Sequence, residues 1–214
     1  RQLYTQTKRA LRRGLGNPID KQEWIDETRA AALSMLQSAR IDPAAVNSIW
    51  DNLGDDYFLR ENATDIAWHT QAILEHLNDA RPLVLIRKST SEQFEGATQI
   101  FIHTRDMPNL FAATVAAMDQ LHLTVLDARI ITAKTHFSLD TYIVLDENGA
   151  PIHDERRLGI IHDTLMQTLS NPDRFPEIVQ RRMPRQLKHF DVKTTVTISN
   201  DIVNQRTIVE VMTL

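Results

Sequence analysis

Histidine and aspartate, which hold divalent metals in many enzymes, stand side by side at two places in this sequence. They are His153-Asp154 and His162-Asp163. The first follows a hairpin-like turn, and the second lies on a predicted helix, where neighbouring residues point about 100° apart. His69 and His76 can share one helix face, but no third ligand accompanies them in the sequence. We therefore expect polar surface residues at the dipeptides and no metal site.

A second candidate is the segment 105–111, Arg-Asp-Met-Pro-Asn-Leu-Phe, which joins a predicted strand to a predicted helix. Residues Thr98–Thr104 alternate with a period of two, as a strand does. The apolar residues after the segment recur at helical spacing: Leu110, Phe111, Val115 and Met118. Pro108 suits a helix start, and Asp106 can accept hydrogen bonds from first-turn amides. Helix capping explains Asp106 and Pro108 without a ligand. The motif alone does not decide between this role and ligand binding.

The pattern around this segment predicts an α+β fold. Two apolar strands, Leu123–Ile131 and Phe137–Leu145, follow the helix, and a turn leads to a second helix, Glu155–Leu169. A last strand, Lys193–Ser199, completes the β-α-β-β-α-β order of ferredoxin-like domains. The strand Phe137–Leu145 has one face that packs on helices and one mixed face able to meet solvent or another sheet.

Residues 1–79 are predicted to be helical. The expected helices are Gln2–Leu15, Lys21–Gln37, one starting at Asp42-Pro43, and one starting at Thr64-Asp65 with Ile66, Ile73 and Leu77 facing inward. The run Leu83–Ile86 predicts a strand covered on both faces, which either joins the sheet or lies between domains. Residues 206–214 alternate like Thr98–Thr104, and we expect this strand to pair with the complete sheet or with another copy of the chain.

Composition narrows the class of protein. Charged residues make up 24% and apolar residues 42% of 214 residues, as in ordinary folded proteins. No apolar run is long enough to cross a membrane. The sequence has no cysteine, which excludes disulfides and fits a reducing compartment, and its net charge of −4 argues against nucleic acid as main partner. We therefore expect a cytoplasmic protein that binds neither membrane nor nucleic acid.

Six motifs, in this order, resemble the C-terminal half of bacterial PII uridylyltransferase/uridylyl-removing enzymes. They are Asp-Tyr-Phe-Leu-Arg (56–60), Ile-Ala-Trp-His (66–69), Pro-Leu-Val-Leu-Ile-Arg (82–87), Arg-Asp-Met-Pro-Asn-Leu-Phe-Ala-Ala-Thr (105–114), Phe-Ser-Leu-Asp-Thr (137–141) and Arg-Gln-Leu-Lys-His-Phe (185–190). Within this resemblance, Asp106-x-Pro108-x-Leu110 is similar to the signature of ACT domains, small modules that bind amino acids and regulate the enzymes carrying them.

The resemblance implies four parts. They are the tail of an HD phosphohydrolase domain (1–79), a linker with one strand (80–97), a first ACT domain (98–199) and the first strand of a truncated second one (200–214). It further implies a glutamine-sensing segment of an enzyme that transfers UMP from UTP to the nitrogen signal protein PII and removes it again. By this reading the catalytic residues, and the Mg²⁺ or Mn²⁺ they use, belong to other domains. We therefore expect a non-catalytic fragment that self-associates through its ACT domain.

The resemblance also names an effector site. Its residues are Asp106, Met107, Pro108, Asn109 and Leu110, with Asp127 and Ala128 on the next strand. A helix N-terminus attracts the carboxylate of an amino acid, and Asp106 offers a counter-charge to its amino group. Most ACT domains have glycine where this chain has Asn109, and asparagine tolerates unusual backbone angles but adds bulk.

Two other classes stay open. An ACT module of another enzyme, or a stand-alone amino-acid sensor, would share the turn, although residues 185–190 and the preceding helices argue against it. An RNA-recognition module shares the strand-helix order. It would need an aromatic, basic third strand, whereas Phe137–Leu145 contains Asp140.

Overall fold

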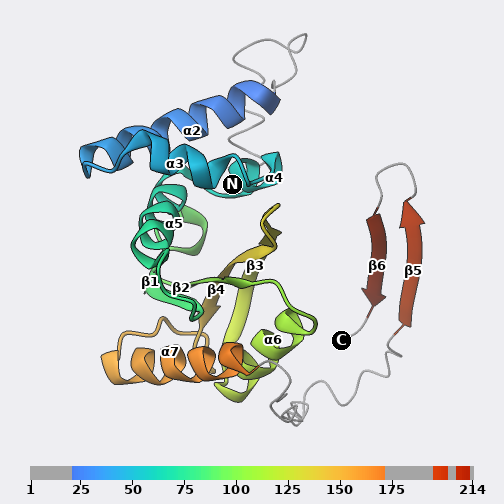
Figure 1. The fold of residues 1–214 in the computed structure, drawn as a ribbon. Coiled ribbons are helices and arrows are strands. Elements are labelled where there is room, and N and C mark those ends of the chain that lie inside the picture. Colours follow the sequence, from blue (N-terminus) through green and yellow to red (C-terminus); the bar gives the residue numbers. More distant parts are fainter. Residues whose placement is uncertain (1–20, 172–194, 202–205, 213–214) are drawn as a thin grey trace. The chain divides into compact units, whose positions relative to one another are not determined.

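The computed structural model describes residues 21–171, 195–201 and 206–212. The chain forms two compact units, residues 1–178 and residues 179–214. In the first unit, helices precede an antiparallel sheet whose far face carries two further helices (Figure 1). The predicted helix Gln2–Leu15 and the 185–190 motif lie outside the described residues. None of the described helices combines the length and the apolar character that a membrane crossing requires.

The described part of the chain begins with α2 (Lys21–Ser38), α3 (Pro43–Trp50), α4 (Asp55–Arg60) and α5 (Ala63–His76). Helix α3 starts as predicted, since the Asp42 carboxylate accepts a hydrogen bond from the Ala44 amide at 3.1 Å. Helix α5 starts slightly earlier than predicted, because Asn62 is its N-cap and accepts a bond from the Asp65 amide at 2.9 Å. Helix α4 was not predicted, because six residues are too few to display a helical period.

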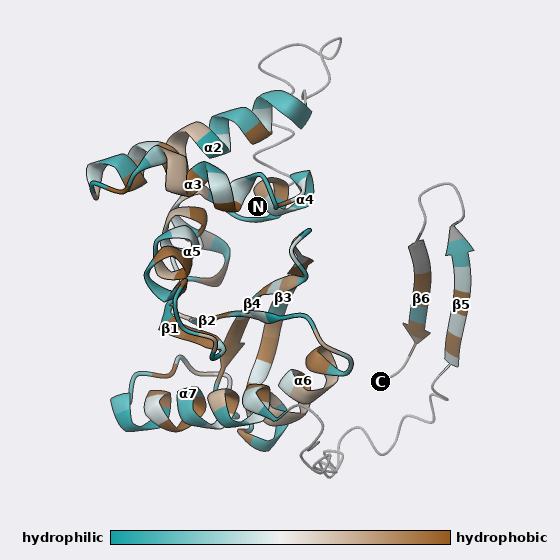
Figure 2. Ribbon diagram, viewed as in Figure 1, coloured by the Kyte–Doolittle hydropathy of each residue, from teal (hydrophilic) through white to brown (hydrophobic). Residues whose placement is uncertain are grey.

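The inner sides of these helices form one core. Its buried residues from the helices and the α3–α4 turn are Ile25, Ala32, Leu36, Val46, Trp50, Leu53, Tyr57, Phe58, Ile66 and Ile73. Figure 2 shows the resulting alternation of hydrophobic and hydrophilic residues along α2. The prediction that Leu77 faces inward is wrong, since 64% of this residue is exposed. Leu77 follows the last residue of α5, so the helical period no longer sets its direction.

A four-stranded antiparallel sheet follows in the order β1-β2-β4-β3. Its strands are β1 (Leu83–Lys88), β2 (Thr98–Arg105), β3 (Thr124–Thr132) and β4 (Phe137–Leu145), with α6 (Leu110–Gln120) after β2 and α7 (Glu155–Ser170) after β4. Strand β4 has the predicted bounds. The prediction of an α+β fold with a helical segment and an ACT-like sheet is confirmed.

The edge of the sheet beside β2 differs from the prediction. Strand β1 occupies it, with Leu83 opposite His103 and Lys88 opposite Thr98. The predicted strand Lys193–Ser199 corresponds to β5 (Thr195–Asp201), which pairs with β6 (Arg206–Met212) in a separate sheet. The short connection 89–97 makes pairing of β1 with β2 entropically cheap compared with closure from a strand far along the chain. Of the two alternatives for residues 83–86, the structure shows the first: they join the sheet.

The same finding corrects the expectation for the C-terminal strand. Strand β6 pairs with β5 in a separate two-stranded sheet, so the prediction that it pairs with the complete sheet is wrong. Pairing with another copy of the chain stays a prediction. The exposed apolar residues of this second unit are Val196, Ile198, Ile208, Val209, Val211 and Met212. The proposed domain bounds, including the truncated second ACT domain over 200–214, stay a prediction.

Helices cover both faces of the four-stranded sheet. Phe101, Ile131 and Leu139 join the core of the N-terminal helices. On the opposite face, the sheet residues Ile100, Ile102, Tyr142 and Val144 pack against α6 and α7. The mixed face of β4 thus meets helices, and the expectation of solvent or another sheet there is wrong.

Candidate functional site

The predicted effector residues Asp106–Leu110 form the turn between β2 and α6. Asn109 is the N-cap of α6 and has φ 66° and ψ 5°, a left-handed conformation, without a side-chain capping bond. Glycine adopts this conformation most easily, and asparagine tolerates it better than most other residues. The backbone angles therefore explain why asparagine suits this position of the chain.

Asp106 does not cap the helix, contrary to the prediction. Helix α6 begins at Leu110, so Asp106 lies too far ahead of the first-turn amides, and its own amide donates to the His136 carbonyl at 2.8 Å. Within the described residues, the Asp106 carboxylate has no hydrogen-bond or ion-pair partner. This exposed carboxylate is free to meet a cationic group of a ligand.

The left-handed turn gives a stability prediction. Asn109→Ala should lower the free energy of unfolding by about 1 kcal/mol, because asparagine tolerates the left-handed conformation better than alanine does. Asn109→Gly should not lower it, since glycine adopts the same angles without the cost of a Cβ. Urea denaturation of both variants measures the difference. Equal destabilisation would show that the asparagine side chain, not the backbone angle, maintains the turn.

Asp127 and Ala128 lie on β3, away from the turn. They stand opposite Ile143 and Tyr142, whereas the turn follows Arg105 at the end of the sheet where Phe137 begins β4. The six positions from Phe137 to Ile143 correspond to about 20 Å of strand. Within one chain, Asp127 and Ala128 are thus separated from the turn Asp106–Leu110, whose five residues are consecutive. Their role as ligand contacts stays a prediction.

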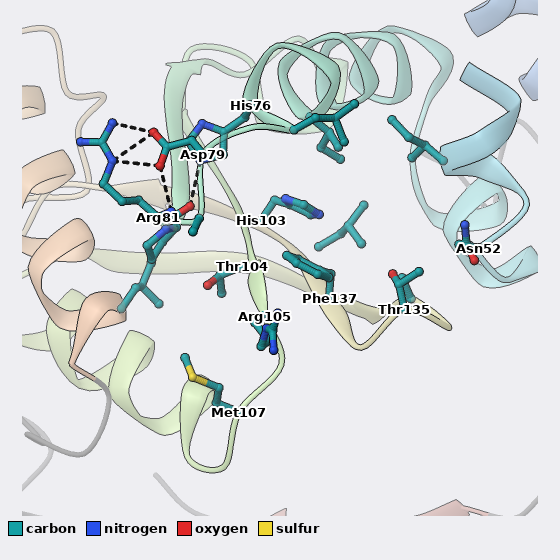
Figure 3. A pocket seen from close by; sticks show the side chains of 18 of the residues that line it. Asn52, His76, Asp79, Arg81, His103, Thr104, Arg105, Met107, Thr135 and Phe137 are labelled. Atoms are coloured by element: carbon teal, nitrogen blue, oxygen red, sulfur yellow. Dashed lines mark hydrogen bonds and ion pairs between the residues drawn. The ribbon is translucent and has the colours of Figure 1, made fainter. Parts of the chain in front are cut away.

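A cavity of about 650 Å³ opens beside the turn, between the N-terminal helices and the sheet (Figure 3). One wall comes from α3, α5 and the segment after each, and includes Ile49, Leu53, Ile73, His76, Leu77, Asp79 and Arg81. The other comes from the ends of β2 and β4 and includes His103, Arg105, Phe137 and Leu139, with Met107 from the turn. Sequence reasoning missed this cavity because only tertiary packing brings together the separate chain segments that line it.

The sheet wall carries an aromatic pair beside a cation. The His103 ring stacks on the Phe137 ring with 5.0 Å between centroids, and the Arg105 guanidinium lies 6.0 Å from the Phe137 centroid. Burial, assisted by His76, lowers the pKa of His103 to about 4, so this ring is neutral near pH 7. Arg105 forms no ion pair with any residue that the structure describes. It is therefore an uncompensated positive charge at the cavity.

Buried ion pairs join the N-terminal helices to the sheet. Asp65 of α5 pairs with Arg87 of β1, and Glu61, which follows α4, pairs with Arg129 of β3. Burial raises the pKa of Glu61 to about 7, and the charge of Arg129 opposes that rise. Arg129 also bonds Asp127 at 2.9 Å. The helical segment is thus held to the sheet by charge as well as by apolar packing.

The histidines and aspartates that suggested metal binding have other partners. Asp154 caps α7 by accepting from the Arg156 amide at 3.0 Å, and His162 bonds the exposed Asp163. His69 is buried with its Nδ1 3.0 Å from the Tyr57 hydroxyl, while His76 bonds a backbone carbonyl. Across the described ranges, no group of three or more such side chains is placed to hold a metal. These residues do not fit the Mg²⁺ or Mn²⁺ implied for the parent enzyme.

Known proteins match both the helical part and the whole chain. Residues 20–72, which include α2 to α4 and most of α5, match the family described as "Uridylyltransferase GlnD fifth domain". This match does not test the interpretation of the helices as the tail of an HD domain.

Curated relatives extend the match to the sheet. A bifunctional uridylyltransferase/uridylyl-removing enzyme of Ectopseudomonas mendocina is 54% identical over 98% of this chain and 24% of its own length. Enzymes of the same name from Pseudomonas putida and Pseudomonas aeruginosa are 55% and 54% identical over 99% of the chain, again 24% of their own length. The chain thus spans about a quarter of these relatives, and the resemblance seen in the sequence is confirmed. Over nearly all of its length, the chain is similar to a segment of the bifunctional uridylyltransferase/uridylyl-removing enzymes.

Proposed function

We propose that this chain is the glutamine-sensing regulatory segment of a cytoplasmic, bifunctional enzyme that uridylylates and deuridylylates the nitrogen signal protein PII. The observation that carries the proposal is the 54–55% identity to enzymes of that name, which extends through helices and sheet alike. An ACT module of an unrelated enzyme would not share the helices. UTP and the catalytic Mg²⁺ or Mn²⁺ belong to domains outside this segment.

The turn between β2 and α6 suits a zwitterionic amino acid. The N-terminus of α6 presents first-turn backbone amides and the positive end of the helix dipole, which favour a carboxylate. Asp106, without a partner in the described part of the chain, can accept the ammonium group. Opposite charges at opposite ends of one short turn are what an α-amino acid requires.

Asp106→Ala tests this assignment. It should weaken L-glutamine binding by about 10-fold to 100-fold, because a hydrogen bond to a charged group contributes roughly 1.5–3 kcal/mol. Isothermal titration calorimetry measures the affinity, which we expect near a Kd of about 1 mM for the unaltered chain. Asn109→Gly separates two roles of the asparagine: binding survives if the residue only shapes the turn.

The control is Asp56→Ala, which removes an exposed aspartate on α4. It should leave glutamine affinity unchanged. Thermal melts of each variant show whether the fold is intact. Unchanged affinity of the Asp106 variant for glutamine would contradict the effector site at this turn.

A further inference from the structure

The cavity between the N-terminal helices and the sheet has the features of a ligand site. We propose that it binds a small carboxylic acid with an apolar body, the carboxylate at Arg105 and the body between Phe137 and the helical wall. This site adjoins the turn Asp106–Leu110, which contributes Met107 to its lining. Leu139 of the cavity belongs to the core toward the N-terminal helices, while Leu110 and Met118 of α6 belong to the core on the opposite face of the sheet.

The size and walls of the cavity favour a small molecule. Its volume of about 650 Å³ lies within the range of roughly 300–1,000 Å³ usual for small-molecule pockets and far exceeds a packing defect. Leu77, although 64% exposed, lines it together with Ile49, Leu53, Ile73 and Leu139. An exposed leucine beside a concave apolar wall is the feature that a bound apolar group would cover.

The polar groups of the cavity leave one charge free. The Arg81 guanidinium forms three hydrogen bonds of 2.6 to 3.1 Å with Asp79, so this pair is neutral as a whole. His76 Nε2 lies 2.8 Å from the Arg81 carbonyl oxygen, which occupies that nitrogen. His103, stacked on Phe137, is neutral. Among the described residues that line the cavity, Arg105 alone thus offers unpaired positive charge to a ligand, and Figure 3 shows it next to Phe137.

One guanidinium selects the class of anion. A planar guanidinium matches a carboxylate with two parallel hydrogen bonds. A phosphate dianion needs several donors to replace its hydration, whereas Arg105 is the one described cation of the lining without an ion pair and lies beside the Phe137 ring. A monocarboxylate whose remaining atoms are apolar satisfies both the charge and the walls.

A matched pair of probes tests the proposal on the whole chain. We expect 3-phenylpropionate to shift the backbone amide signals of Leu77, His103 and Leu139 in ¹H–¹⁵N NMR spectra at about 10 mM, ten times a Kd of about 1 mM. Its neutral analogue, 3-phenylpropanamide, should bind about tenfold more weakly, because it lacks the charge that Arg105 complements. Absence of shifts at these three residues with 3-phenylpropionate would overturn the proposal.

Arg105→Gln tests the role of the cation. It should weaken 3-phenylpropionate binding by about tenfold and leave 3-phenylpropanamide binding unchanged. Arg156→Gln, at an exposed arginine of α7, is the matched control and should change neither. Equal affinity of the Arg105 variant and the unaltered chain for the acid would remove Arg105 from the site.

A separate titration with L-glutamine distinguishes this site from the proposed effector site. We expect glutamine to shift signals of the turn, and those shifts to persist in Arg105→Gln. Glutamine shifts at Leu77 and Leu139 that disappear in Arg105→Gln would show that the cavity itself is the glutamine site. That result would overturn the cavity as an independent site for apolar acids.

Discussion

Arg129→Met should lower the free energy of unfolding by about 3–5 kcal/mol near pH 8, and by much less near pH 5.5. The Arg129 side chain is 14% exposed and that of Glu61 is 2% exposed, so the two charges meet away from water. Removing the cation leaves a buried carboxylate without its counter-charge. Breaking one side of a buried ion pair is among the costlier single substitutions because the remaining charge stays desolvated.

The pH dependence follows from the pKa of Glu61. Its folded pKa of about 7 lies above its ordinary value of 4.5, so protonated Glu61 stabilises the fold below 4.5, and this contribution is lost as pH rises through 7. Arg129 lowers the pKa of Glu61, so its removal should raise that pKa further. The decrease in stability with pH then extends to higher pH and becomes larger. Near pH 5.5 Glu61 is mostly protonated with or without Arg129, and mainly the packing of the side chain is lost.

Urea denaturation at the two pH values measures this effect. Arg156→Met, at an exposed site on α7, should change stability little at either pH. A loss for Arg129→Met that is the same at both pH values would mean that Glu61 ionisation does not govern this junction.

Phe101→Ala should lower the free energy of unfolding by about 3–5 kcal/mol, because it opens a cavity in a closed core. Phe101 is fully buried in the sheet, and its ring stacks on His69 of α5 at a centroid distance of 3.8 Å and an interplanar angle of 10°. Trp68 lies 6.1 Å away on the same helix. The substitution thus removes the main aromatic contact between the sheet and the helical segment.

Phe111→Ala provides the matched control, because the same side chain is 53% exposed on α6. It should cost less than about 1 kcal/mol. Urea denaturation followed by tryptophan fluorescence and by circular dichroism compares the two variants. For Phe101→Ala we expect both probes to report one transition at lower urea. Similar losses for the two variants would contradict the packing of α5 on the sheet.

Sequence patterns identified the elements whose signals are local. The alternation in Phe137–Leu145 gave the bounds of β4, and the Asp42-Pro43 pair located the start of α3, because strand period and helix capping depend on neighbouring residues. The prediction that Asp106 caps the helix was wrong. An aspartate ahead of a proline matches a cap, but the left-handed angle at Asn109 delays the helix by several residues.

Features that depend on contacts between distant segments could not be predicted from local sequence patterns. Which strand takes the edge beside β2 depends on competition between β1 and β5, and both have the apolar pattern of a strand. The two candidate sites differ in the same respect. The turn was visible as one motif, whereas the cavity needs α3, α5, β2 and β4 to be packed first. The partner of Arg129 was equally hidden, since Glu61 lies 68 positions away.

Strand β1 contributes to two cores at once. Leu83 and Leu85 pack against the core of the N-terminal helices, while Val84 and Ile86 pack against the core of α6 and α7. A displacement of this strand by one residue would exchange the two sets, so it has no intermediate position that satisfies both. Because packed cores do not deform continuously, a ligand that moves α6 must either leave β1 in place or shift the N-terminal helices by a discrete step. Any coupling between the two helical layers through β1 would therefore occur in discrete steps.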